Sequence, residues 1–372
     1  MYTPIQAAMT AIGTANPPYQ SAQSAIAESI AAGLHLSPAQ KRLLKSVYKS
    51  SGIENRYSVL SDFSQGAGEF QFFPNDIDQP FPSTAARMAI FKENALNLAI
   101  SAIHNCFSQL PNFNLSDITH LITVSCTGMY APGLDIEIVH QLKLNSSTKR
   151  TAVNFMGCYG AFNAIKLADA FCKSEPGANV LIVSVELCTL HFQRNSNLDN
   201  MVSNAIFADG AAAVLIQSKP DQEKYLLLQD FHSELLPQTQ EEMAWHIGDS
   251  GFDIVLSSYV PEIIESGIAA FTEKLFARSG LSPTDIDFYA IHPGGIKILE
   301  ACEAALNITA DQNKQAYQVL RDYGNMSSAT ILFVLKALFN DLKQEDHQKN
   351  IFSCAFGPGL TLESMILKVS TN

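Results

Sequence analysis

The sequence predicts an α/β fold built from two similar halves. Short apolar runs alternate along the chain with longer amphipathic stretches, which is the pattern of strands alternating with helices. The order turn, strand, loop and helix occurs in residues 115–142 and again in residues 281–302. In each half a helix rich in small residues follows, and then another strand. Any α/β protein repeats strand, loop and helix, but three matched units in one order favour duplication.

The expected elements follow from these patterns. Apolar runs predict buried strands at His120–Ser125, Val180–Val185, Ala211–Ile216, Phe288–Ile291 and Ile351–Ala355. Amphipathic stretches predict helices at Ser83–Cys106, Gly160–Cys172, Val260–Arg278 and Ser327–Leu342. The polar, proline-containing segment Gln217–Lys224 predicts the linker between the halves. We therefore divide the chain into residues 1–219 and 220–372.

Composition excludes several classes of function. The chain has 372 residues, 47% of them apolar, and a formal net charge of −12, so bulk charge does not favour binding to nucleic acid or to an anionic membrane. Its seven cysteines form no CxxC pair, so we expect neither a disulfide framework nor a metal site. We also expect the protein to work in a reducing compartment. No leader-like N-terminus and no membrane-spanning run is seen. We expect a soluble, cytoplasmic protein.

Cys158 is the first candidate for chemistry. It stands between two glycines, in Met156-Gly-Cys-Tyr-Gly160, just before a predicted helix. The positive end of a helix dipole favours the thiolate form of cysteine, and a neighbouring histidine would lower the thiol pKa further. Such a sulfur is a soft nucleophile suited to thioesters. Cysteines inside apolar helices and strands are instead read as packed core residues.

His292 and Asn325 are its expected partners. His292 follows a predicted strand in His292-Pro-Gly-Gly295, and Asn325 precedes a predicted helix in Tyr323-Gly-Asn-Met326. Taken alone, His292 is more simply explained as a histidine whose hydrogen bonds are satisfied, and Asn325 as a helix cap. All three candidates lie where the chain enters a loop or helix, the edge at which open α/β sheets bind ligands. Papain-like proteases use the same trio, but their Cys-Gly-Ser-Cys-Trp signature is absent.

The chain resembles the type III polyketide synthases, the chalcone-synthase-like branch of the thiolase superfamily. The likeness covers roughly Ala11 to Val369 and rests on five motifs: MGCYGAFNAIKLA around Cys158, AIFADGAAAVLI, IHPGGIKILE around His292, YGNMSSATILFVL around Asn325, and AFGPGLTLE. The resemblance implies a five-layered α/β/α/β/α thiolase fold, a homodimer of the bacterial type, and no bound cofactor. It also implies acyltransfer, with malonyl units condensed by decarboxylation onto an acyl starter.

The resemblance implies a role for each site residue. Cys158 would take the acyl group from a coenzyme A or carrier-protein thioester. His292 and Asn325 would donate hydrogen bonds to the enolate that decarboxylation of malonyl-coenzyme A leaves, as donors aimed at a developing oxyanion lower a barrier. A second oxyanion hole would use backbone N–H groups of Cys158 and of the loop Ala355, Phe356, Gly357, Pro358 and Gly359.

The substrate pocket departs from the plant pattern. Phe207 matches the family's gatekeeper phenylalanine, but Ile254 replaces a second one and Trp245 replaces a glycine that lines the elongation cavity. Three further pocket positions that are threonines in plant enzymes are Cys126, Cys188 and His191. The indole predicts few extensions or a redirected cavity, with a pyrone, a resorcinol or a simple β-ketoacyl product.

A basic cluster is the candidate site for coenzyme A. Residues 41–56 hold it in an otherwise acidic chain, and Lys45, Lys49 and Arg56 are the candidates, although such clusters are usually solvated helix faces. Two alternatives stay open: a single-condensation enzyme like ketoacyl synthase III, and a non-catalytic partner subunit of another synthase. Several malonyl units in the product exclude the first, and acyl transfer to Cys158 excludes the second.

Overall fold

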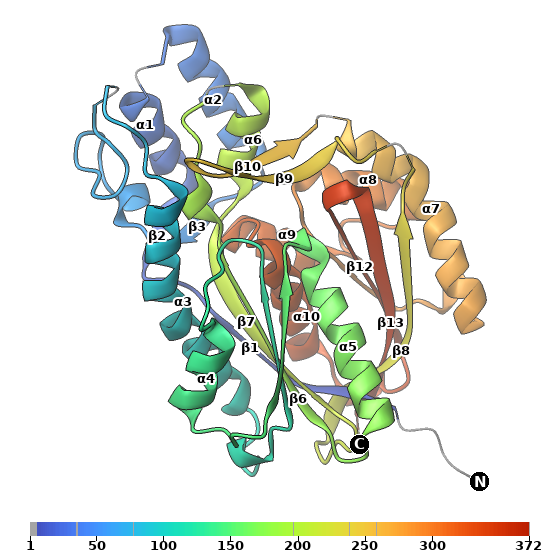
Figure 1. Cartoon of the computed structure of the whole chain (residues 1–372). Helices are drawn as coiled ribbons and strands as arrows, with labels where there is room; N and C mark the ends of the chain where they lie inside the picture. Colours follow the sequence, from blue (N-terminus) through green and yellow to red (C-terminus); the bar gives the residue numbers. More distant parts are fainter. Residues whose placement is uncertain are drawn as a thin grey trace.

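The computed structural model describes residues 6–34, 36–76, 78–195, 197–237, 239–257 and 259–371. Its central feature is a nine-stranded sheet in the order β11-β12-β13-β8-β1-β7-β6-β4-β5 (Figure 1). None of the helices in the described ranges is long and apolar enough to cross a membrane.

The first half of the chain forms five strands of this sheet. They are β1 (Ala8–Ala15), β4 (His120–Ser125), β5 (Lys149–Asn154), β6 (Asn179–Leu187) and β7 (Asp209–Gln217). Strand β4 pairs in parallel with β5 and β6, whereas β7 pairs antiparallel with β6 and β1. Every residue of β4 and β7 is buried, which explains why these strands show no alternation of apolar and polar residues.

The second half repeats this arrangement. Its strands are β8 (Lys224–Leu235), β11 (Phe288–Ile291), β12 (Asn350–Gly357) and β13 (Thr361–Thr371). Strand β11 pairs in parallel with β12, and β13 pairs antiparallel with β12 and β8. The series β4, β6, β7, β1 therefore matches β11, β12, β13, β8, which confirms the duplication. The halves join where Ala8 and Met9 of β1 pair with Leu227 and Leu226 of β8.

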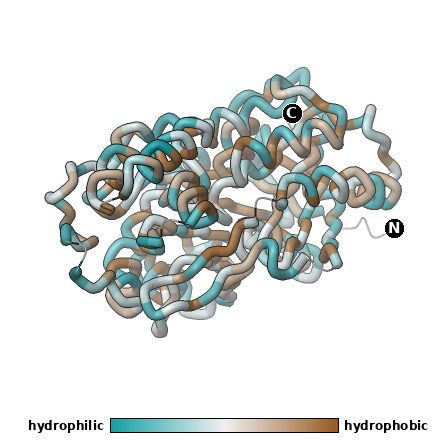
Figure 2. Tube along the Cα trace, turned by 90° about the horizontal axis from the view of Figure 1, so that it is seen from above, coloured by the Kyte–Doolittle hydropathy of each residue, from teal (hydrophilic) through white to brown (hydrophobic). Residues whose placement is uncertain are grey.

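Four long helices complete five layers. Helix α3 (Thr84–Phe107) packs on β1, β6 and β7, and α7 (Val260–Ser279) packs on β8 and β13. Between the halves, α5 (Gly160–Ser174) contacts β4, β6 and β13, while α10 (Thr330–Asp341) contacts β1, β7 and β11. Figure 2 shows strongly hydrophobic segments running through the interior of the molecule. The expected helix, sheet, helix, sheet, helix order is confirmed.

The remaining elements gather mostly around one end of the sheet. The helices are α1 (Gln23–Gly33), α2 (Pro38–Ser50), α4 (Leu134–Leu142), α6 (Leu198–Ile206), α8 (Ile296–Leu306) and α9 (Lys314–Tyr323). The strands are β2 (Tyr19–Ala22), β3 (Asn55–Ser58), and the hairpin β9 (Met243–Gly248) and β10 (Gly251–Leu256). In Figure 1 the hairpin, α6 and α8 lie near the end of α5 at which that helix begins.

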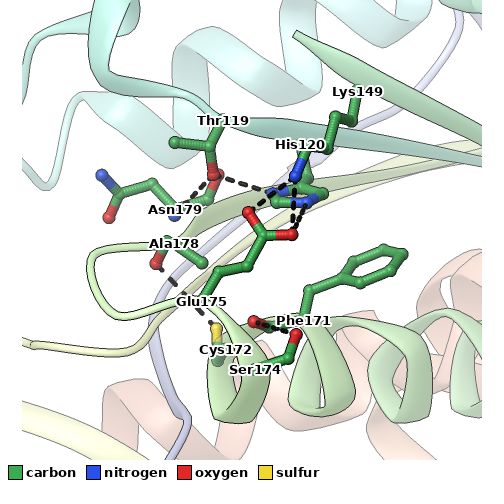
Figure 3. A network of polar contacts seen from close by, with 9 residues as sticks. All are labelled: Thr119, His120, Lys149, Phe171, Cys172, Ser174, Glu175, Ala178 and Asn179. Carbon is green, nitrogen blue, oxygen red and sulfur yellow. Dashed lines mark hydrogen bonds and ion pairs between the residues drawn. The ribbon is translucent and has the colours of Figure 1, made fainter.

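The far end of α5 is fixed to the sheet by a polar cluster (Figure 3). The His120 ring stacks on Phe171 with centroids 4.5 Å apart, and its Nδ1 lies 2.8 Å from the Thr119 hydroxyl. Glu175, at the end of α5, accepts hydrogen bonds of 2.6 and 2.7 Å from Lys149 on β5. These contacts fasten the C-terminal end of α5 to β4 and β5. They thereby help to fix the position of the whole helix, including its first turn at the other end.

All the strands and helices predicted from the sequence are present. The expected helix Ser327–Leu342 consists of a 3₁₀ turn at Ser327–Ala329 followed by α10, and it starts at Ser327, whose φ of 47° lies in the left-handed region. The predicted linker Gln217–Lys224 runs from the last residue of β7 to the first residue of β8.

Candidate active site

Cys158, His292 and Asn325 line one cavity of about 330 Å³. Its walls come from both halves: the 3₁₀ turn before α5, the loop after β11 and the loop before α10 on one side, and α2, α6 and the β9–β10 hairpin on the other. The topology thus brings together three residues that are separated by up to 167 positions (325 − 158).

The turn Gly157–Tyr159 presents Cys158 at the start of α5. Gly157 has a φ of 71°, and a Cβ added there would lie 2.2 Å from Cδ of Pro358. Only glycine allows both this backbone conformation and this close approach. The turn that holds Cys158 is therefore packed closely against Pro358, which follows β12.

The sulfur of Cys158 contacts Asn325. Burial raises the pKa of the Cys158 thiol to about 12, although contacts with Ser327 and Asn325 act to lower it. This direction is opposite to the lowered pKa expected from the helix dipole and a neighbouring imidazole. Because burial outweighs the dipole, attack on a thioester requires the thiol proton to move to an acceptor in the same cavity.

His292 lines the same cavity. It is 1% exposed, and neither ring nitrogen has a hydrogen-bond partner among the described residues. Its backbone N–H donates to the Cys354 carbonyl at 2.9 Å, which fixes the residue to the end of β12. Burial lowers the pKa of His292 to about 3, so the imidazole is neutral near pH 7, with one nitrogen that donates and one that accepts. Two unused ring nitrogens in a cavity indicate a ligand site.

Asn325 is oriented by its neighbours. Its Oδ1 accepts from the Ser327 N–H at 2.9 Å and from the Thr330 hydroxyl at 3.3 Å. Its Nδ2 donates one proton to the Gly294 carbonyl at 3.2 Å, and the side chain also hydrogen-bonds the Cys158 sulfur. Because Oδ1 is occupied by donors, the amide must present Nδ2 to the cavity.

A buried carboxyl group links the catalytic segments and has no counterpart in the sequence predictions. Glu186, which is 0% exposed, accepts from the Cys126 N–H at 2.9 Å and from the Thr127 hydroxyl at 2.8 Å. It also accepts from the hydroxyl of Ser328, three residues after Asn325. Burial raises the pKa of Glu186. The sequence signal that could have revealed this residue is a glutamate inside an apolar strand, because a buried carboxyl group must be paired.

Comparisons with known proteins assign the fold and the cavity to a family. Residues 3–220 match the N-terminal domain, and residues 228–371 the C-terminal domain, of chalcone and stilbene synthases. The chain belongs to this family. It is 31% identical over 367 residues to the alpha-pyrone synthesis polyketide synthase-like Pks18 of Mycobacterium tuberculosis, covering 98% of this chain and 91% of that one. Family members are type III polyketide synthases, so the protein is an acyltransferase that condenses acyl units.

Two further relatives agree. The chain is 29% identical over 336 residues to type III polyketide synthase C of Arabidopsis thaliana, covering 88% and 86% of the two chains. The crystal structure of PKS-I from the brown alga Ectocarpus siliculosus superposes with a TM-score of 0.89 at 29% identity, covering 99% of both chains. The likeness of the two folds supports the thiolase architecture predicted from the sequence.

Three pocket residues of this type III polyketide synthase form one wall of the cavity. Phe207 and Trp245 pack with ring centroids 6.3 Å apart, and Trp245 is paired with Ile254 across the hairpin. All three also line a second cavity of about 20 Å³ on the other side. The indole Nε1 donates to the Cys126 carbonyl at 2.9 Å, so Trp245 is held in the wall by a hydrogen bond.

The three positions that differ from plant threonines separate into two groups. Cys126 and Cys188 line the main cavity. His191 does not: it lies behind the wall and lines only the smaller cavity. Its Nε2 is 2.7 Å from the Thr127 carbonyl, and its Nδ1 accepts from the Phe252 N–H at 3.0 Å, so it acts as a brace for the hairpin. Phe252, whose ring stacks on His191 at 4.2 Å, was not predicted.

The loop expected to form an oxyanion hole approaches Cys158 in part. Ala355, Phe356 and Gly357 end strand β12, and Ala355 pairs with Glu363 in the sheet. Phe356 and Pro358 line the cavity. Gly359, in the next turn, has a φ of 73°. The structure therefore brings the middle of this loop, rather than its whole length, to the nucleophile turn.

The residues predicted to bind coenzyme A do not line the cavity. Arg56 is 3% exposed and donates to the Asn204 and Phe207 carbonyls at 2.8 and 2.6 Å, so it is a buried structural residue. Lys45 pairs with Glu28 on α1 at 2.6 Å. The residues of α2 that line the cavity are Val47 and Ser50, together with Ser51, which follows the helix. Lys45 and Lys49 each lie two positions from Val47, which is a rotation of about 200° around the helix axis. Of these three residues, Arg56 is buried and Lys45 is paired, while Lys49 is exposed beside Ser50, and their binding of coenzyme A stays a prediction.

Proposed function

We propose that this synthase carries its growing acyl chain on Cys158 and extends it by decarboxylation of malonyl-coenzyme A. The observation that carries the proposal is the state of the cavity: the Cys158 thiol lines it together with His292 and Asn325, both His292 ring nitrogens are unused, and the Asn325 side chain hydrogen-bonds the Cys158 sulfur. These are the donors that an enolate needs, placed around a nucleophile.

The loading step transfers an acyl group to sulfur. The Cys158 thiol attacks the carbonyl carbon of the acyl thioester, and its proton moves to His292. The carrier thiolate leaves and regains a proton from the imidazole, so no net charge is created in the cavity. Both pKa shifts are consistent with an uncharged resting pair.

The extension step needs no general base. When malonyl-coenzyme A loses CO₂, the electron pair of the broken C–C bond moves onto the thioester oxygen and forms an enolate. One N–H of His292 and the Nδ2 group of Asn325 would stabilise this oxygen. The enolate carbon then attacks the carbonyl of the Cys158 thioester, which gives a β-ketoacyl thioester and frees the sulfur for reloading.

The wall of aromatic side chains supports a short product. Trp245, Phe207 and Ile254 close the cavity on the side of the hairpin. We infer few extensions and release as a pyrone, a resorcinol or a simple β-ketoacyl compound; the similarity to the alpha-pyrone synthesis relative favours the pyrone.

Product analysis tests the proposal. The protein is incubated with a panel of acyl-coenzyme A starters and ¹³C-labelled malonyl-coenzyme A, and products are identified by mass spectrometry. Two or more labelled units in one product support iterative extension. A product with a single unit favours an enzyme like ketoacyl synthase III, and no product together with no acyl-enzyme favours a non-catalytic partner subunit.

Three features of organisation are proposed with it. The chain divides into residues 1–219 and 220–372, since β7 ends at Gln217 and β8 begins at Lys224. The cytoplasm fits seven free cysteines. A homodimer fits β5, whose residues are mostly exposed at an edge of the sheet, because an open edge offers backbone groups for pairing with a second copy. Light scattering coupled to size exclusion measures the oligomeric state.

A further inference from the structure

The exposed residues among those that line the catalytic cavity mark its mouth. Ser50 at the end of α2, Leu198 at the start of α6 and Lys297 in the first turn of α8 are exposed, whereas His292 and Asn325 are buried. A thioester substrate therefore enters between the ends of three helices and reaches the reactive residues at the buried end.

The mouth carries one cation suited to an anionic carrier. Among the described residues that line the cavity, Lys297 is the single lysine or arginine, and Asp199 is the single carboxylate. Lys297 has neither a hydrogen bond nor an ion pair within the described part of the chain. An exposed, unpaired ammonium group beside a cavity is free to pair with a ligand.

The chemistry of the substrates says which ligand group belongs at the mouth. Coenzyme A and the prosthetic group of an acyl-carrier protein share a 4′-phosphopantetheine arm, which is uncharged between its sulfur and its phosphate. When the thioester lies beside Cys158, the uncharged arm fills the cavity and the phosphate projects from the mouth. Most residues that line the cavity are apolar or small, among them Val47, Val202, Val260 and Ile264, which suits such an arm.

The first turn of α8 adds to the attraction. Gly295 caps this 11-residue helix without a side-chain hydrogen bond, so the dipole of the helix acts on an anion near Lys297. The two unpartnered nitrogens of His292, three residues before Gly295, independently show that this cavity is built for a ligand.

We propose that Lys297 binds the phosphate of the phosphopantetheine arm and so sets the affinity for the thioester donor. This role rests on the function proposed above, and it replaces Lys45, Lys49 and Arg56 as the cation that recognises the carrier. Lys297 acts in binding and takes no part in the transfer of the acyl group.

Paired donors with and without a phosphate test this role. Loading of Cys158 is followed by intact-protein mass spectrometry with an acyl-coenzyme A and with the same acyl-pantetheine, which lacks the phosphate. Lys297→Ala should lower kcat/KM for the coenzyme A ester about tenfold, through KM, because a charge-assisted hydrogen bond is lost. It should leave the pantetheine ester unchanged. Lys297→Arg should restore most of the loss, and Lys49→Ala, the matched control on α2, should have no effect.

Binding without chemistry separates this proposal from the catalytic one. Calorimetry with desulfo-coenzyme A, which cannot form a thioester, should show weaker binding to Lys297→Ala and tighter binding to Asp199→Asn. Acyl-carrier protein as a second donor shows whether the same phosphate is read on a protein. Equal losses for the pantetheine and coenzyme A esters, or unchanged desulfo-coenzyme A binding in folded Lys297→Ala, would overturn the role of Lys297. Failure of every ester to load the wild-type protein, with desulfo-coenzyme A binding intact, would instead remove the catalytic proposal.

Discussion

The sulfur of Cys126 accepts a hydrogen bond from the backbone N–H of Gly157 at 2.9 Å. The same thiol lies 3.6 Å from the Gly157 carbonyl, to which it donates. Gly157 immediately precedes Cys158, so a residue 32 positions earlier in the chain (158 − 126) helps to set the backbone of the nucleophile turn. The carbonyl of Cys126 in turn accepts from Trp245, which connects the cavity wall to the nucleophile.

Cys126→Ala should slow acyl loading, whereas Cys126→Ser should retain most of it. Alanine leaves the Gly157 N–H without an acceptor, at a cost of about 1–3 kcal/mol, and frees the turn to shift. Serine keeps an acceptor at nearly the same place. Stopped-flow loading with one acyl-coenzyme A measures both variants. Equal rates in Cys126→Ala and the wild type would show that the contact does not position Cys158.

Trp245→Gly should admit bulkier starters or allow more malonyl additions, because it removes the partition between the two cavities. Truncating a large packed aromatic also costs about 3–5 kcal/mol of stability. Trp245→Phe is the control: it keeps most of the wall and loses only the bond to the Cys126 carbonyl, worth about 1 kcal/mol. The readout is product length by mass spectrometry. A folded Trp245→Gly enzyme with the wild-type starter range and products would show that the indole does not limit the chain.

His292→Ala and Asn325→Ala should separate the two half-reactions. Each removes a donor to the enolate, so each should lower malonyl decarboxylation by about 10²–10³. His292→Ala should also slow loading, because it removes the acceptor for the Cys158 proton, while Asn325→Ala should load nearly normally. Release of labelled CO₂ measures the first reaction and acyl-enzyme formation the second. Equal loading rates in the two variants would argue against proton transfer to His292.

The predictions from sequence were accurate where residue type alone determines the outcome. Strand β4 was predicted to the residue because it is buried on both faces and rich in the β-branched residues Ile122, Thr123 and Val124. Cys158, His292 and Asn325 were each predicted from a glycine-rich turn beside a strand or helix, and the structure places all three in one cavity, while their catalytic roles stay a prediction. The predicted cavity wall was found through resemblance to the family.

Other features depend on the directions in which side chains point in the fold, which the sequence alone does not specify. The basic residues of α2 were expected at the entrance, yet helix rotation turns Val47 and Ser50 to the cavity and Lys45 toward α1. Arg56 reads as a surface cation until the fold places two carbonyls around it. His191 was placed in the pocket because the corresponding position is a pocket threonine in the plant enzymes, but His191 lies on a turn at Cys188–His191 and lines the smaller cavity behind the wall.

The stability of the protein should depend on pH through His191. Burial lowers the pKa of His191 to about 3, below the 6.5 of an exposed histidine, so the unfolded state takes up the proton first. The contribution of neutral His191 is present above pH 6.5 and is lost as the pH falls from 6.5 toward 3, at up to about 1.4 kcal/mol per pH unit.

His191→Gln isolates this term, because glutamine also offers one donor and one acceptor and does not titrate. Between pH 6.5 and 5 the wild type should lose about 2 kcal/mol more of its free energy of unfolding than the variant. Other buried groups, such as Asp209 with its raised pKa, are common to both proteins and cancel in the difference. Denaturant titrations at the two pH values provide the measurement, and parallel pH profiles would contradict the assignment.

Intact-protein mass spectrometry of the acyl-enzyme tests the central claim most directly. After incubation with an acyl-coenzyme A, the wild-type protein should gain the mass of one acyl group, and peptide mapping should place it on Cys158. Cys158→Ala should gain none while keeping the wild-type unfolding transition, and Cys188→Ala, which removes another thiol from the same cavity, should still be acylated. A covalent acyl group on the folded Cys158→Ala protein would show that another residue is the nucleophile and would contradict the account.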